Sequence, residues 1–303
     1  MKKLLHLFWT HLFPLPVVSG LEGALARVLT AGVVYYFLPF LPPPTVQPVP
    51  VGMAHFVDLT WLGQVSSFET YRQVLVALLV VYASGIALPV VLPVLATAYI
   101  ALYTLINSQG FTNHSHHILA VVLFSQALAA LFYLRPKAGC WLKPSLGLNA
   151  WMLVAAQAGI ASAYLISVLS KLWNSGFTWL FRSHYIALDM VKTMRQNYHS
   201  ALDPRYAVEP PNVVWMLEHP FWTALLFDLG FVVEALIVLS VGTRKLALLF
   251  GIGTILMHRS INYFMGLEFY QNESMLAVFF VNVPFLIACL LGQRRKAPLN
   301  GHV

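Results

Sequence analysis

Long apolar runs alternate with short polar segments along the whole chain, and this alternation is the first guide to its fold. Eight runs have the apolar character of helices that cross the roughly 30 Å hydrocarbon core of a bilayer. They lie at residues 22–41, 74–92, 94–107, 117–134, 148–172, 221–241, 245–267 and 274–291. The pattern predicts an all-α fold, a polytopic transmembrane helical bundle of eight spans.

The second and third runs are an ambiguous pair because only Pro89 and Pro93 separate them. Proline kinks or ends a helix. The segment 74–107 therefore forms either two spans or one long kinked helix followed by a re-entrant piece. We adopt two spans, because the charge distribution described below fits an even number.

The composition supports a membrane protein over a soluble one. Of the 303 residues, 59% are hydrophobic and only 10% are charged, with a mean hydropathy of +0.72. A water-soluble domain carries about 25% charged residues, so a soluble enzyme of this length is excluded. The net charge of +7 does not indicate a nucleic-acid partner, because surplus Lys and Arg in a membrane protein mainly report topology.

Basic residues mark alternate connections between the runs. They occur at residues 2–3, between the fourth and fifth runs at 135–143, at 244–245, and in the tail at 294–296. Because basic connections stay on the cytoplasmic side, we predict eight spans with both termini cytoplasmic and an integral membrane location.

This topology divides the chain into three parts. Residues 1–21 are an N-terminal interfacial segment, residues 22–292 the transmembrane domain, and residues 293–303 a basic cytoplasmic tail. The two long outer connections are 42–72, which is proline-rich and predicted to be extended, and 173–220. The second is rich in Trp and Tyr, which predicts helices lying on the outer interface.

A metal site is not expected. Cys140 and Cys289 are far apart and form no C-x-x-C motif, so neither a disulfide framework nor a zinc site is indicated. The cluster His114, His116 and His117 is dense enough to consider metal binding. The remaining histidines are scattered singly, and no partner carboxylates accompany the cluster.

Lys171, at the outer end of the fifth run, has two interpretations. A lysine beside Trp173 can extend its ammonium to the membrane interface. Alternatively, it is a desolvated amine that accepts a proton as a general base. The residues alone do not decide between the two.

His258, Arg259 and Asn262 lie deep in the seventh run. Polar side chains at that depth face the bundle interior or a wet cavity, because contact with lipid is costly. They form either a structural cluster that joins helices or part of a site.

Two carboxylates in the sixth run, Asp228 and Glu234, are equally expensive at membrane depth. We predict that one of them pairs with Arg27 or Arg259. The sequence does not distinguish which.

The predicted topology places three of these residues toward the same side. His114 begins a span at the outer face, Lys171 ends one there, and His258 lies below in a third. A pocket that opens on the extracytoplasmic side and holds one base and two imidazoles is the expected result.

Three short motifs resemble the HTTM family, the transmembrane domain shared with vitamin K-dependent gamma-glutamyl carboxylase. They are Asn-His-Ser at 113–115, Ser-Lys-Leu-Trp at 170–173 followed by Gly176, and Met-His at 257–258 followed by Asn262 and Phe-Met-Gly-Leu at 264–267. Their order and spacing cover residues 20–292.

The resemblance implies a fold and an activity. In that family the lysine that matches Lys171 deprotonates vitamin K hydroquinone, oxygen adds, and the oxygenated base leads to capture of carbon dioxide on a glutamate. His114 matches the histidine that assists this step. The resemblance thus implies a quinol as cofactor, with O2, possible use of CO2 and no metal, and a small peptide as the modified partner.

The same resemblance implies roles for further residues. His258 would position the ligand, and Asn113, Arg259, Asn262 and Trp173 would line the substrate site. The alternative function is a non-catalytic membrane factor for peptide or toxin maturation, export or immunity. An enzyme requires an amine at Lys171, whereas a scaffold accepts Arg, which keeps the charge but does not act as a base near neutral pH.

Overall fold

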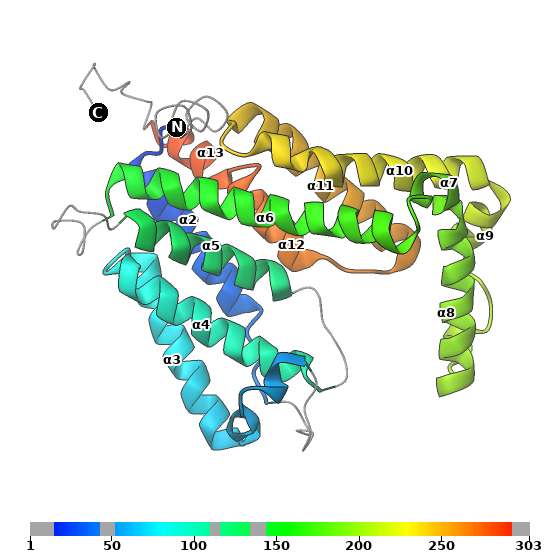
Figure 1. The fold of residues 1–303 in the computed structure, drawn as a ribbon, viewed down its shortest axis with the longest axis horizontal. Helices are drawn as coiled ribbons and strands as arrows, with labels where there is room; N and C mark the ends of the chain where they lie inside the picture. Colours follow the sequence, from blue (N-terminus) through cyan, green and yellow to red (C-terminus); the bar gives the residue numbers. More distant parts are fainter. Residues whose placement is uncertain (1–14, 43–51, 110–115, 134–143, 293–303) are drawn as a thin grey trace.

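The computed structural model describes residues 15–42, 52–109, 116–133 and 144–292, and the described part is helical throughout, without a strand (Figure 1). The long helices are α2 (Gly20–Tyr36), α3 (Val65–Ser84), α4 (Leu88–Asn107), α5 (His117–Tyr133), α6 (Leu146–Asn174), α10 (Pro220–Leu236), α11 (Arg244–Met265), α12 (Tyr270–Phe279) and α13 (Val283–Leu290). The predicted apolar runs overlap these helices, but the run 74–92 extends across the break between α3 and α4, and the last run forms two helices.

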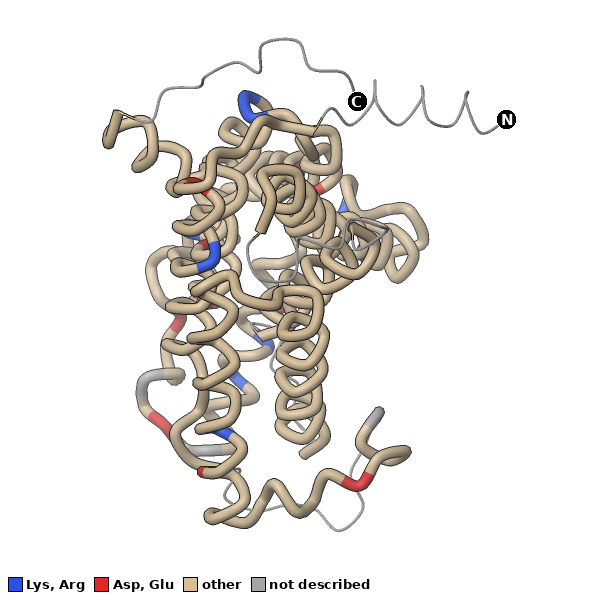
Figure 2. The backbone as a smooth tube through the Cα atoms, turned by 90° about the vertical axis from the view of Figure 1, so that its left-hand side faces the viewer, with Lys and Arg blue, Asp and Glu red and all other residues tan. Residues whose placement is uncertain are grey.

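Three of these helices are long and apolar enough to cross a membrane: Leu88–Asn107, Leu146–Asn174 and Pro220–Ser240. The pair α12 and α13, bent by 45° at a short break, makes a fourth if it counts as one span. Figure 2 shows how sparsely charged residues are distributed along the described helices. The structure therefore fits an integral membrane protein, while the number of eight spans and the cytoplasmic termini stay predictions.

The ambiguous segment 74–107 forms two helices, but the boundary differs from the predicted one. α3 ends at Ser84 and is capped by Gly85, which has φ 81°, and α4 begins after Ala87, which has φ 50°. Pro89 lies in the first turn of α4, where its missing N–H costs nothing, and Pro93 lies inside the helix. α3 also begins at Val65, so the end of the connection predicted to be extended is helical.

The long connection after α6 is helical as well. It contains α7 (Trp179–Arg182), η4 (Ser183–Tyr185), α8 (Ile186–Ala201), η5 (Pro204–Tyr206) and α9 (Pro211–Glu218). η4 packs against α10, and α8 packs against α9 and η4. In Figure 1, α8 stands across the ends of α6 and α10.

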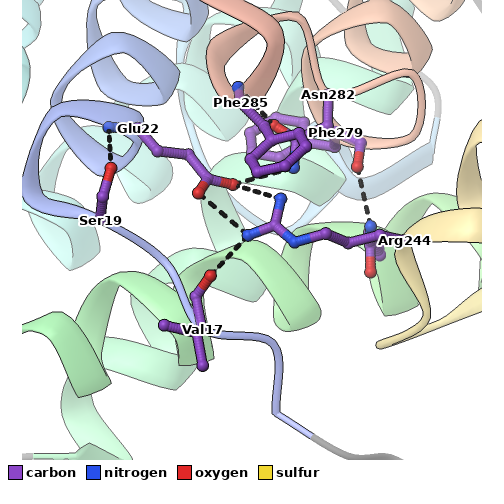
Figure 3. Close-up of polar contacts among 8 residues, drawn as sticks. Val17, Ser19, Glu22, Arg244, Phe279, Asn282 and Phe285 are labelled. Carbon is purple, nitrogen blue, oxygen red and sulfur yellow. Dashed lines mark hydrogen bonds and ion pairs between the residues drawn. The ribbon is translucent and has the colours of Figure 1, made fainter. Parts of the chain in front are cut away.

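A buried ion pair joins helices from both ends of the described chain (Figure 3). Arg244, at the start of α11, donates to both carboxylate oxygens of Glu22 in α2, over 2.7 and 2.9 Å. Asn282 donates to the same carboxylate over 2.9 Å and caps α13 by accepting from the Phe285 N–H. This cluster fixes α2, α11 and the break between α12 and α13 together.

Candidate functional site

A cleft of about 200 Å³ lies between α10 and α11. Its walls are residues of these two helices between 226–234 and 253–261, and Lys171 and Trp179 close one end. Most of the lining is apolar, and the polar side chains among it are Lys171, Glu234 and Ser260, besides the indole of Trp179. The cleft therefore presents one polar end to an apolar interior.

Lys171 and Glu234 form an ion pair at that polar end. Their side chains are 28% and 8% exposed, so the carboxylate is nearly withdrawn from solvent. Ser167, one turn before Lys171 on α6, also reaches the Glu234 carboxylate at 3.5 Å. The ring of Trp179 lies 5.7 Å from the lysine nitrogen, which is within cation–π range.

This pairing bears on the two interpretations of Lys171. Glu234 lies 14 residues after Pro220, the first residue of α10, which is about 21 Å along the helix axis. Lys171 therefore meets α10 far from its first turn. Its ammonium contacts a buried carboxylate there, in the last turn of α10, instead of extending toward the first turn.

The predicted carboxylate partners need correction. Glu234 pairs with Lys171, and not with Arg27 or Arg259. Arg259 pairs at 2.5 Å with Glu273 of α12. Arg27 donates to the side-chain oxygen of Asn149 at 2.8 Å. The sequence offered no signal for these pairs, because they depend on how the helices are rotated and shifted against each other.

His258 contacts the face of α6 that also carries Lys171. Its Nε2 is 3.2 Å from the hydroxyl of Tyr164, and its ring stacks on Phe269 at 4.7 Å. Tyr164, Ser167 and Lys171 follow one another at positions i, i+3 and i+7, so they share one face of α6. Sequence reasoning missed Tyr164, although its spacing from Lys171 is a usable signal.

The other predicted site residues lie in different surroundings or outside the described residues. Trp173 is 78% exposed, and Trp179 contacts the lysine in its place. Asn262 is partly buried in α11, where its carbonyl accepts from the Gly266 N–H. Asn113 and His114 lie outside the described residues.

The neighbouring histidines of the predicted cluster lie at the start of α5. His116 stacks on Tyr103 at 4.2 Å, and His117 contacts Asn107 at 3.0 Å. Burial, together with the nearby His117, lowers the pKa of His116 to about 4. Within the described ranges, no three His, Cys, Asp or Glu residues are grouped so that they could hold a metal ion.

Comparisons with protein-family models, with curated proteins and with solved structures give no match to this chain. The geometry of the cleft is therefore the basis for a functional assignment.

Proposed function

We propose that this chain is a multi-pass membrane enzyme that binds a lipophilic quinol in the cleft between α10 and α11 and removes a proton from one of its hydroxyl groups. The observation that carries the proposal is the Lys171–Glu234 pair at the polar end of an otherwise apolar cleft. The resemblance of three motifs to the HTTM family supports the same activity.

The ion pair is the proton acceptor in this proposal. The basic atom is the Nζ of Lys171, which passes its shared proton to the Glu234 carboxylate before it accepts another. A quinol hydroxyl that donates to the pair leaves an ammonium, a carboxylic acid and a quinolate. The ammonium of Lys171 then faces the new negative charge and stabilises it, and the dry surroundings strengthen this attraction.

The walls of the cleft fit a ligand that arrives from the bilayer. Leu229 of α10 and Leu256 of α11 both line the cleft and are more than half exposed on the outer surface of the bundle. In a membrane these leucines contact lipid, so a lipophilic molecule can enter between the helices without crossing water. A charged or strongly polar substrate would lose its hydration on that route.

The proposal includes the predicted topology, with eight spans, both termini cytoplasmic and the cleft on the extracytoplasmic side. Deprotonation would be coupled to oxidation or epoxidation of the quinol by O2. The coupled step would be the carboxylation, with CO2, or another modification of a small peptide.

Product formation from vitamin K hydroquinone tests the proposal. Purified protein in detergent receives the hydroquinone, oxygen and bicarbonate, and epoxide is quantified for the wild type, Lys171→Ala and Lys171→Arg. We expect epoxide from the wild type and from neither variant, because Arg keeps the charge but does not release its proton near neutral pH. Epoxide at the wild-type rate from Lys171→Arg would contradict a base at this position.

The second candidate function is a non-catalytic membrane factor for peptide or toxin maturation, export or immunity. The observation in its favour is the ion pair itself, because a buried pair also joins α6 to α10 in a purely structural role. In that case Lys171→Arg keeps the protein's biological effect, and no quinol is consumed by any variant.

A further inference from the structure

The segment that joins α6 to α7 exposes three large aromatic side chains. Trp173, Phe177 and Phe181 are 78%, 67% and 79% exposed. Residues 172–181, which contain all three, include no Asp, Glu, Lys, Arg or His. Single exposed rings are ordinary, but an uncharged segment with three of them indicates a surface that an apolar partner covers.

Phe177 holds its ring outward in a strained backbone conformation. It has φ 63° and directly follows Gly176, which has φ 57°. Glycine adopts this left-handed region freely, whereas a residue with a Cβ atom is strained there. Because the Phe177 side chain is 67% exposed, most of its surface is available to a partner outside the described part of the chain.

The polar groups of the same turn bond within it. The backbone N–H groups of residues 175–178 donate to oxygen atoms of residues 170–175, and so do the side chains of Asn174, Ser175 and Thr178. An unbonded polar group in lipid is costly, because no water replaces the missing hydrogen bond. A turn that satisfies these donors internally is therefore suited to lipid contact.

The segment adjoins two helices that are long and apolar enough to cross a membrane. It follows α6 directly, and α7 lies against α10 (Figure 1). Because Lys171 pairs with Glu234, α10 continues for about 21 Å beyond this level toward Pro220. That part of α10 exposes Phe221 and Leu229 to 69% and 56%. Lipid that covers this surface of α10 also reaches the neighbouring turn.

We infer that residues 173–181 are a membrane anchor, which inserts Trp173, Phe177 and Phe181 among lipid acyl chains beside the end of α6. The anchor begins two residues after Lys171, so it holds the polar end of the cleft next to lipid.

The anchor ends where charged residues begin. Arg182 directly follows it, and α8 exposes Lys192 and His199. A long basic side chain at this boundary can extend its charge toward water. The inference does not depend on the chemistry proposed for the cleft, so the two can fail separately.

Nitroxide labels on single cysteines test which medium contacts the segment. The full chain, with Cys140→Ser and Cys289→Ser, is reconstituted in liposomes of phosphatidylcholine and phosphatidylglycerol. Power-saturation electron paramagnetic resonance then measures collisions of the label with oxygen, which is enriched among acyl chains, and with a neutral nickel chelate, which is enriched in water. If the serine background does not fold, alanine replaces both cysteines.

The labels are placed at Phe177→Cys and Phe181→Cys, with two matched controls. Ile166 is 64% exposed on α6 and represents a side chain in contact with lipid. Lys192 is exposed on the charged helix α8 and represents contact with water. The two test positions are independent, so one variant that elutes like the wild type in size-exclusion chromatography is sufficient.

We expect the ratio of oxygen to nickel accessibility at both test positions to be at least about threefold that at Lys192→Cys, and close to that at Ile166→Cys. A ratio equal to that at Lys192→Cys would place the segment in water. Low accessibility to both reagents would place it under protein, such as a second copy of this chain. Either result would overturn the inference.

Discussion

Removing either charge of the buried pair between Glu22 and Arg244 should destabilise the protein, and the loss should be larger when Arg244 is removed. The Glu22 side chain is 3% exposed and that of Arg244 is 16% exposed. Removing one partner of a buried pair costs about 3–5 kcal/mol, because the other charge is left uncompensated. Among the described residues, Arg244→Met leaves Asn282 as the one side-chain donor to the enclosed carboxylate of Glu22, so we expect a loss in the upper part of that range.

Glu22→Gln should cost less, about 3 kcal/mol. Arg244 is the more exposed partner, and it keeps the carbonyl of Val17 at 2.6 Å and the ring of Phe285 at 4.1 Å (Figure 3). The double variant removes both charges and should be more stable than the sum of the single losses implies, by about 2 kcal/mol or more.

Reversible unfolding in mixed micelles with increasing dodecyl sulfate, followed by circular dichroism, measures these differences. A matched control is the pair Arg195–Glu209, which has a similar distance of 2.6 Å but half-exposed and partly exposed side chains. Arg195→Gln should cost less than about 1 kcal/mol. Additive losses in the double variant, or a larger loss for Glu22→Gln than for Arg244→Met, would refute this reasoning.

Three further predictions concern single residues. Burial lowers the pKa of His116 to about 4 from an ordinary 6.5. The contribution of the neutral imidazole to stability is therefore complete above pH 6.5 and is lost as the pH falls toward 4. In His116→Phe, the melting temperature should depend less on pH over this range. Tyr164→Phe removes the hydroxyl at 3.2 Å from His258 and should cost about 1–2 kcal/mol of unfolding free energy. Gly251→Ala places a Cβ atom 2.7 Å from that of Phe280 and should cost about 1–3 kcal/mol.

The predictions for His116 and Gly251 each have a control in the same chain. His199 is exposed on α8, so His199→Gln should leave the pH profile of melting unchanged. Gly32→Ala adds a methyl group to an open helix surface and should stabilise the protein by up to about 1 kcal/mol. A pH profile of melting in His116→Phe that matches the wild type would contradict the burial of His116. A neutral effect of Gly251→Ala would contradict the close packing of Gly251 against Phe280.

Much of the helical architecture follows from the apolar pattern. The run at 117–134 corresponds to His117–Tyr133, and the run at 245–267 corresponds to Arg244–Met265. A long apolar run has few alternatives to a helix, because only helices and closed barrels satisfy the backbone within a membrane. Local composition therefore predicts where helices occur.

Breaks between helices were less predictable, although signals existed. Gly85 follows α3 and Ala87 precedes α4, both in left-handed conformations, whereas Pro89 and Pro93 predicted a break further along the chain. The last run breaks at Asn282, which adopts φ 57° and precedes a proline in the first turn of α13. Asparagine tolerates the left-handed region, so an asparagine followed closely by a proline is a sequence signal for this bend.

The candidate site could be predicted only in part. The cost of charge at membrane depth drew attention to Lys171 and Glu234 as separate residues. That they pair depends on the rotation and depth of α6 against α10, which the sequence does not give. Trp179 contacts Lys171 where Trp173 was predicted to lie, because the chain turns after α6 and brings Trp179 back to the lysine.

A naphthol analogue of the quinol reports directly on the proposed proton acceptor. 2-Methyl-1-naphthol has one hydroxyl, and its deprotonated form absorbs at longer wavelength than the neutral form. Bound to the wild type without oxygen at neutral pH, it should show the absorbance of the naphtholate, and Lys171→Met should bind it in the neutral form. A neutral spectrum with the wild type, or a naphtholate spectrum that persists in Lys171→Met, would contradict deprotonation by the Lys171–Glu234 pair.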